Sequence, residues 1–315
     1  MKKSTIVWLV IATVCVISGS IIFTGALAVN GWNFTKYQTN EHTVNDEFRS
    51  VSVNTDTASV IIKPSDNGET KVVCYEKEKK LHTVEVVESE LVIRVENNRK
   101  WYDYIFNIDS PEITVYLPEG EYSSLNVKAS TGYVKIPSGY TFGSMDISSS
   151  TGMVDNGAFV TGEMKIKTST GAVKVEDSSA GSLDITVSTG KVTINNVTCK
   201  GDISVSVSTG RTNMKNVTCR SFISSGSTGD INLENVIAEE RFNIKRNTGD
   251  IIFERCDAGE IHMKTSTGEI GGSLLTEKIF IAKSNTGDVD VPRGKSGGTC
   301  ETITETGDID IVITK

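Results

Sequence analysis

Residues 183–210 read LDITVSTGKVTINNVTCKGDISVSVSTG and contain one pattern twice. In each copy, two apolar residues spaced two apart precede Ser-Thr-Gly, as Leu183 and Ile185 precede Thr189 and Gly190. A short fixed period is typical of a chain that coils on itself, because each turn buries its apolar face only when the next turn stacks on it. The Thr-Gly pair recurs ten times in register, every 19 or 20 residues, with its glycines at Gly132, Gly152, Gly171, Gly190, Gly210, Gly229, Gly249, Gly268, Gly287 and Gly307.

The residues around each Thr-Gly pair alternate as in β-strands. Positions six and four before the Thr are nearly always apolar, as are positions three and five after it, for example Val192 and Ile194. Each repeat is therefore two short strands, and we expect an all-β parallel β-solenoid, β-helix-like or β-roll-like, of about ten two-strand coils. At about 4.8 Å per coil, the rod would be roughly 45–50 Å long.

The Thr-Gly pair itself is interpreted as a corner. Glycine suits a tight turn because it adopts positive φ without steric cost. Parity along the strand places the Thr side chain inward, where stacked hydroxyls would pass hydrogen bonds along the rod. A feature repeated at every turn favours a structural role over a binding site.

The pattern extends toward the amino terminus in a degenerate form. Around Thr57, Val51 and Val53 precede the corner, Ala58 takes the Gly place, and Val60 follows. We expect this to be an early rung of a β-rich cap over residues 47–120, with the repeat solenoid at 121–315. Further strand-like runs in the cap are Lys71 to Tyr75, Thr83 to Glu88, Glu90 to Val95 and Ile113 to Leu117.

The first 30 residues predict a membrane anchor or a signal segment, followed by a linker over 31–46. Lys2 and Lys3 precede an uncharged run from Thr5 to Val29, long enough for one transmembrane helix. The positive-inside rule then predicts a single-pass cell-membrane protein whose body lies outside the cytoplasm. Ala26-Leu27-Ala28 resembles a peptidase site, so secretion after cleavage is the alternative. Aromatic residues suited to the headgroup region follow the run at Trp32, Phe34 and Tyr37.

Charge and motifs argue against several function classes. A formal charge of −8 and a pI near 5.1 disfavour nucleic acid as a partner. The three histidines, His42, His82 and His262, are scattered, and no nucleophile elbow, zinc motif or phosphate loop is present. We therefore predict no catalytic residue, no cofactor and no enzymatic activity. A carbohydrate-active β-helix enzyme is less favoured, because the repeat intervals leave no long loop to wall a cleft.

Cys199 and Cys219 occupy equivalent places in adjacent coils. Stacked directly, their Cα atoms would lie about 5 Å apart, within the range of a disulfide. The alternative is two small thiols that fill a corner.

Acidic residues follow the corner glycine in the later coils. Stacked carboxylates repel unless water, salt or a cation intervenes, so calcium is conceivable here, although the calcium-binding nonapeptide of β-rolls is missing. The alternative is a solvated charge ladder. These metal candidates are Asp230, Asp250, Glu269, Asp288 and Asp308.

An aromatic cluster in the cap is the candidate for partner binding. Trp101, Tyr102, Tyr104 and Phe106 lie within seven residues of one another. Such side chains stack on sugars or dock a partner protein, and they equally form the apolar plug of a cap.

The strand Ile113 to Leu117 with Pro118, followed by about ten Ser/Asn-Thr-Gly-Asp-Ile-like turns, resembles the putative adhesin family of bacterial β-strand-repeat cell-envelope proteins. The resemblance covers roughly Glu47 to Lys315 and implies a surface-exposed solenoid without established catalytic residues. It also implies an alternative role in envelope-stress sensing. We accordingly expect a non-enzymatic, extracytoplasmic, adhesin-like scaffold that contacts an unknown envelope protein or glycan. The amino-terminal helix would anchor it in the membrane.

Overall fold

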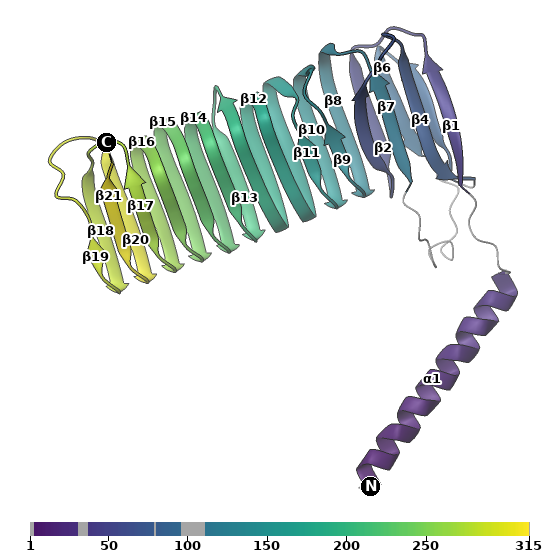
Figure 1. Ribbon diagram of the computed structural model, residues 1–315, viewed down its shortest axis with the longest axis horizontal. Helices are drawn as coiled ribbons and strands as arrows, with labels where there is room; N and C mark the ends of the chain where they lie inside the picture. Colours follow the sequence, from purple (N-terminus) through teal and green to yellow (C-terminus); the bar gives the residue numbers. More distant parts are fainter. Residues whose placement is uncertain (1–2, 31–36, 79, 96–110, 315) are drawn as a thin grey trace.

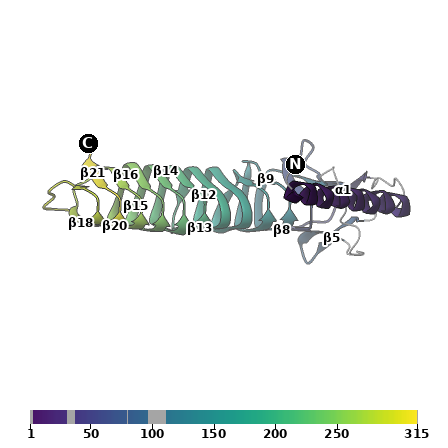
Figure 2. The ribbon, with the colours of Figure 1, turned by 90° about the horizontal axis from the view of Figure 1, so that it is seen from below.

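The computed structural model describes residues 3–30, 37–78, 80–95 and 111–314. Within these residues it has one helix, α1 (Lys3–Asn30), and twenty-one strands that form a rod of stacked coils (Figure 1). Seen after a quarter turn, the coils follow one another around a narrow core (Figure 2). The predicted all-β parallel solenoid with a β-rich cap is confirmed.

The middle of the rod consists of coils that pair in parallel with the next coil along the chain. Leu183 lies beside Ile203, and Ile203 lies beside Phe222. Several strands continue around a corner without interruption. The strands are β8 (Gly120–Thr131), β9 (Val134–Ile136), β10 (Tyr140–Thr151), β11 (Val154–Asn156), β12 (Phe159–Cys199), β13 (Ile203–Thr209), β14 (Thr212–Thr228), β15 (Ile231–Thr248), β16 (Ile251–Thr267) and β17 (Ile270–Leu274).

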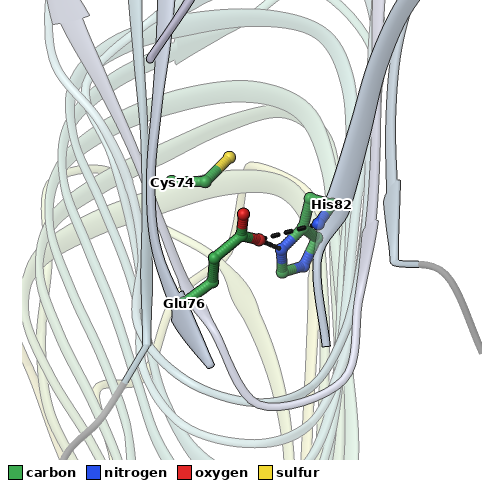
Figure 3. Close-up of side chains that lie close together, drawn as sticks. All are labelled: Cys74, Glu76 and His82. Carbon is green, nitrogen blue, oxygen red and sulfur yellow. Dashed lines mark hydrogen bonds and ion pairs between the residues drawn. The ribbon is translucent and has the colours of Figure 1, made fainter. Parts of the chain in front are cut away.

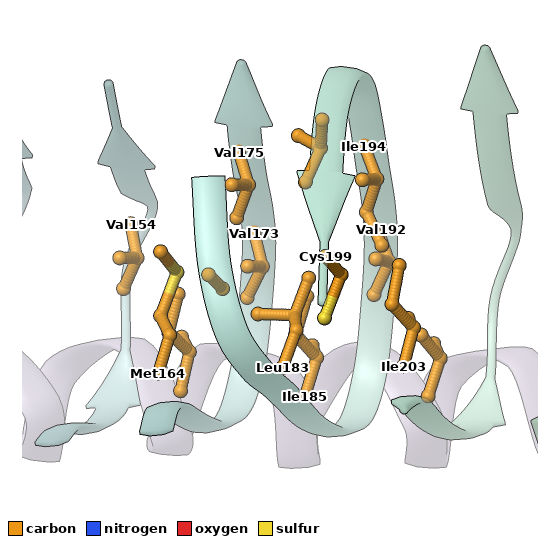
Figure 4. Packing of buried hydrophobic residues seen from close by; sticks show 14 of the residues in the cluster. Val154, Met164, Val173, Val175, Leu183, Ile185, Val192, Ile194, Cys199 and Ile203 are labelled. Atoms are coloured by element: carbon orange, nitrogen blue, oxygen red, sulfur yellow. The ribbon is translucent and has the colours of Figure 1, made fainter. Parts of the chain in front are cut away.

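The core lies between the two faces of each coil. Leu183 and Ile185 point inward from one face, and Val192 and Ile194 from the other; all four are at most 1 % exposed (Figure 4). Alternation puts every second side chain inside, so the apolar residues read from the repeat form one continuous cluster along the rod. Burial of these columns is the main force that stacks the coils.

The Thr-Gly corners are partly as predicted. All ten corner glycines have positive φ, between +123° and +155°. The prediction that the corner Thr points inward is wrong, because all ten are exposed. The alternation of inward and outward side chains ends one residue before the corner Thr, where the chain already bends. The inward hydroxyls stand two residues before the corner Thr, and one of these, Thr265, donates to the Gly249 carbonyl of the neighbouring coil at 3.1 Å.

A second ladder forms the opposite corner of the coils. Asn196, Asn216 and Asn235 each stand seven residues after a corner Thr and have φ of 52–53°. Asparagine tolerates this left-handed conformation better than most residues. The Nδ2 of Asn235 donates to Oδ1 of Asn216, and Asn216 donates in the same way to Asn196, both at 2.9 Å. The amide side chains thus link three coils.

The cap adds antiparallel strands to the first rungs. The strands β2 and β3 stack directly against β8 and β9, with Val51 beside Leu125 and Val60 beside Val134, so the degenerate rung is real. On the other side, β6 and β7 pair in parallel with β2 and β3. Antiparallel strands β5, β4 and β1 then close this end. The bounds are β1 (Tyr37–Val44), β2 (Ser50–Thr55), β3 (Ser59–Pro64), β4 (Thr70–Lys77), β5 (His82–Val87), β6 (Glu90–Val95) and β7 (Glu112–Leu117).

At the other end, the coils do not stack in chain order. The strands there are β18 (Ile279–Thr286), β19 (Val289–Asp290), β20 (Thr299–Thr306) and β21 (Ile309–Ile313). The final pair, β20 and β21, lies between β16–β17 and β18–β19. This order of coils requires a glycine at position 298. A Cβ on Gly298 would lie 1.7 Å from the Gly259 carbonyl oxygen. The coil formed by β18 and β19, which is next to last in the chain, therefore lies at the end of the rod. Its residues Ile279 and Ile281 are exposed.

Helix α1 stands apart from the rod in Figure 1. Hydroxyl side chains interrupt its apolar run and bond back to the preceding turn, as Thr13 donates to the Leu9 carbonyl at 2.8 Å. In the part of the chain that the structure describes, no helix reaches the length and apolar character needed to cross a membrane. The predicted transmembrane helix is therefore not supported.

Candidate functional site

Among the residues that the structure describes, one group of metal-binding side chains lies close together in the cap and consists of Cys74, Glu76 and His82 (Figure 3). One ligand atom from each of the three lies within 4.8 Å of the others, and all three residues are buried. Alternation along β4 puts Cys74 and Glu76 on the same inward face. His82, at the start of β5, returns to this face after the chain turns.

Hydrogen bonds hold the carboxylate and the imidazole together. Glu76 Oε2 accepts from the His82 backbone N–H at 2.7 Å and lies 2.6 Å from His82 Nδ1. Glu76 Oε1 accepts from Nδ2 of Asn40 on β1 at 2.6 Å. His82 Nε2 lies 3.0 Å from Oγ1 of Thr55 on β2. The cluster thus joins four strands of the cap through side chains.

Burial affects the two acids of the cluster in different ways. Burial by itself would raise the pKa of Glu76, but the hydrogen bonds from His82 and Asn40 lower that pKa below its usual value. Burial, with the nearby Glu76 charge, raises the pKa of the Cys74 thiol to about 12. In the protein without a bound ion, the pair is therefore a carboxylate beside a protonated thiol.

The order Thr55, His82, Glu76 has the connectivity of a hydroxyl, imidazole and carboxylate triad. A triad needs an accessible nucleophile beside space for a substrate. Thr55 is only 3 % exposed, and the cavity lined by Thr55, Glu76 and His82 measures about 10 Å³. That space holds about one water molecule. The geometry suits a hydrogen-bonded or metal-binding cluster better than nucleophilic catalysis.

The predicted acidic column is present, in a different order. Along the rod it runs Asp230, Asp250, Glu269, Asp308, Asp288, because the last two coils exchange places. Carboxylates accept backbone N–H groups of the next coil: Asp250 Oδ1 from Glu269 at 2.9 Å, and Asp308 Oδ1 from Asp288 at 2.8 Å. These hydrogen bonds give the acidic residues a structural role, because they link the corners of neighbouring coils. That the column is a solvated charge ladder without a specific cation stays an untested prediction.

Other predicted residues meet different outcomes. Trp101, Tyr102, Tyr104 and Phe106 lie outside the described residues, as do Trp32 and Phe34. Cys199 and Cys219 are both free and buried, as corner-filling thiols would be.

A groove in the cap was not predicted from the sequence. Its volume is about 480 Å³, and its lining includes Phe48 and Tyr122, whose rings stack with centroids 6.1 Å apart. Arg49 and Glu47 stand at the same groove.

The cluster around His82 was also missed, although its residues were visible. The alternation Cys74-x-Glu76 in a predicted strand signals that both side chains share one face. Nothing in the local sequence indicates that His82, Thr55 and Asn40 meet the same face, because those contacts depend on how the strands pair.

The repeat geometry defines a β-solenoid protein, and comparison with known families agrees. The chain belongs to the Toastrack DUF4097 family, whose model matches residues 48–206 and 200–315. This confirms the resemblance seen in the repeat. No curated protein matches the chain.

Solved structures of low sequence identity are also similar. One is a putative adhesin from Parabacteroides distasonis, 13 % identical, covering 88 % of this chain and 97 % of that one, with a TM-score of 0.47. Another is a putative adhesin from Bacteroides fragilis, 14 % identical, covering 89 % and 98 %, with a TM-score of 0.38. A third is a putative cell adhesion protein from Clostridium sporogenes, 13 % identical, covering 89 % and 100 %, with a TM-score of 0.23.

Proposed function

We propose that the protein is a non-enzymatic, adhesin-like scaffold outside the cytoplasm, which binds an envelope protein or glycan along one face of its rod. The observation that carries this proposal is the periodic outward face. Parallel stacking places equivalent outward side chains of successive coils in straight columns. Such a surface suits many weak, repeated contacts to an extended partner, whose effects multiply when the contacts are linked.

The column three residues before each corner Thr illustrates the surface. It is rich in lysine and hydroxyl residues, and the exposed lysines give it local positive charge on an acidic protein. Pairing between coils aligns Thr186, Ser206, Ser225, Lys245 and Lys264, and at the other end Lys128, Ser148 and Lys167. This chemistry fits an anionic or hydroxyl-rich partner.

Binding is tested by sedimentation of the purified protein with insoluble cell-wall material and by capture of envelope proteins. The variant Lys167→Glu with Lys264→Glu reverses two charges on this face. Its control, Lys135→Glu with Lys191→Glu, makes the same net change on the opposite sheet, where these lysines are also exposed. We expect the first variant to lose at least about tenfold in affinity and the control to retain binding. Equal binding by both variants, or no binding by the wild type, contradicts the proposal.

Export of the rod is supported by Lys2 and Lys3 followed by the uncharged run from Thr5 to Val29, which is typical of an export signal. Protease added to intact cells is expected to digest the rod while a cytoplasmic marker survives. Protection of the rod until the cells are lysed would place it inside the cytoplasm instead.

A further inference from the structure

We propose that Cys74, Glu76 and His82 form a zinc site that ties the cap to the first rung of the solenoid. A thiolate, a carboxylate and an imidazole are the three donor types that Zn²⁺ uses in proteins. They come from β4 and β5, two strands that are consecutive in the chain but do not pair with each other, and they converge on one buried point.

The spacing of the donors fits one ion after a small adjustment. Zinc lies about 2.3 Å from sulfur and about 2.0–2.1 Å from nitrogen or oxygen, so two atoms on the same ion are roughly 3–4 Å apart. The ligand atoms of the cluster lie within 4.8 Å of one another. The ion takes the place of the 2.6 Å contact between His82 Nδ1 and Glu76 Oε2, and the thiol loses its proton on binding.

The surrounding contacts orient the donors as the outer shell of a metal site does. In proteins, a ligating histidine usually donates its other ring N–H to an acceptor, and a ligating carboxylate is itself hydrogen-bonded. With Nε2 protonated, His82 donates to Thr55 Oγ1 at 3.0 Å and leaves Nδ1 for the metal. Asn40 holds Glu76 Oε1, which leaves Oε2 for the metal.

A water molecule has room beside Glu76 and His82, two of the three ligands. The cavity of about 10 Å³ lined by Thr55, Glu76 and His82 accepts about one water molecule. Three protein ligands with one water complete a tetrahedral site. Two lysines, Lys77 and Lys80, also line this cavity, and the charge of Lys80 is compensated by its pair with Asp56 at 2.7 Å.

The location explains what such an ion does. Asn40, Thr55, Glu76 and His82 belong to four different strands, and two of them, β1 and β4, end the rod on one face. An ion here links the closing strands of the cap to each other and, through Thr55, to the rung that begins the stack. Because the cavity beside the ion holds only about one water molecule and no substrate, the role of the ion is to stabilise the cap, independently of the partner-binding face proposed above.

The test uses the full-length protein, stripped of metal and then titrated with Zn²⁺ or Co²⁺. We expect one equivalent of zinc to be retained, a rise in melting temperature with zinc, and a cobalt spectrum with tetrahedral ligand-field bands and a thiolate charge-transfer band. Cys74→Ser should abolish the charge-transfer band. The matched control is Cys300→Ser, which alters another fully buried cysteine at the far end of the rod.

Each result decides the question. A thiolate band that appears in the wild type and in Cys300→Ser, but not in Cys74→Ser, supports the site. Failure of the wild type to retain zinc, or a cobalt spectrum without a thiolate band, overturns it. If Cys74→Ser does not fold, the wild-type cobalt spectrum and zinc stoichiometry still decide between these outcomes.

Discussion

Single residues at the corners are constrained in two ways at once. A corner glycine has positive φ, and it also lies against the carbonyl of the corner glycine in an adjacent coil. A Cβ built on Gly190 would be 1.6 Å from the Gly171 carbonyl oxygen, a distance that no side chain tolerates. The coils can stack this closely at the corner only because each of these positions lacks a side chain.

Gly190→Ala is therefore expected to destabilise the protein more than its backbone conformation alone would. The unfavourable φ costs about 1–3 kcal/mol, and the clash adds to this. Gly120→Ala is the matched control, because Gly120 has nearly the same φ, +156° against +155°, with open space around its Cβ. Urea midpoints compare the two. Equal loss in both variants would mean that the close stacking of corners contributes nothing.

An ion pair between coils gives a prediction for pH. Arg220 Nε and Nη2 donate to the two oxygens of Asp202, each at 2.8 Å, and these hydrogen bonds lower the pKa of Asp202. Because the folded-state pKa is the lower one, the pair stabilises the protein above the unfolded pKa of about 3.9 and loses this effect as pH falls through the folded pKa. The side chains are partly exposed, so screening by solvent keeps this contribution to stability small.

The measurement compares wild type and Asp202→Asn by urea unfolding at several pH values. The wild type should be more stable near neutral pH, and the difference should shrink in acid below about pH 4. A difference that stays constant with pH would show that the pair is not the cause.

At the scale of strands and corners, the asparagine ladder performs the task that glycine performs at the Thr-Gly corner. Asn216 supplies the left-handed conformation and also two hydrogen bonds, one donated to Asn196 and one accepted from Asn235. Because each amide satisfies the next, the ladder favours stacking of equivalent corners over a register shift.

Three substitutions separate these two contributions. Asn216→Gly keeps the favourable left-handed conformation and loses only the hydrogen bonds. Asn216→Ala loses the hydrogen bonds as well, and the left-handed conformation costs alanine about 1–2 kcal/mol. Asn213→Ala is the control, since Asn213 accepts one bond from Asn232 on a neighbouring strand without unusual φ. We expect the loss of unfolding free energy to rise from the control to the glycine variant to the alanine variant. Similar values for Asn213→Ala and Asn216→Ala would contradict this role.

At the scale of the whole molecule, spatial order and chain order differ at both ends of the rod. In the cap, β6 and β7 lie outside β2 and β3, and at the other end β20 and β21 lie inside β18 and β19. In a solenoid each coil is stabilised mainly by its neighbours. The stability of the coil formed by β18 and β19 therefore depends on the coil formed by β20 and β21.

Removal of residues 296–315 tests this dependence. The shortened chain lacks β20 and β21, so we expect β18 and β19 to lose protection from amide hydrogen exchange, while β14 and β15 keep theirs. Retained protection of residues 279–290 would mean that β18 and β19 dock directly on β16 and β17, as simple chain-order stacking requires.

The sequence alone determined the solenoid, its two-strand coils, the inward columns such as Leu183 and Ile185, and the positive φ at Gly190. Each of these follows from local spacing, because alternation and glycine placement act within one repeat. The orientation of the corner Thr was misjudged, since strict alternation ends where the chain begins to turn.

Only the tertiary structure decided which coil lies next to which and which side chains meet in the cap. Every coil presents similar backbone hydrogen-bonding edges, so the repeat does not specify whether β18 or β20 follows β16. Similarly, Cys74 and Glu76 share a face by alternation, but His82, Thr55 and Asn40 reach them through pairings between separate strands. The meeting of these side chains depends on how the strands pack over the whole cap, and it cannot be predicted from the local sequence.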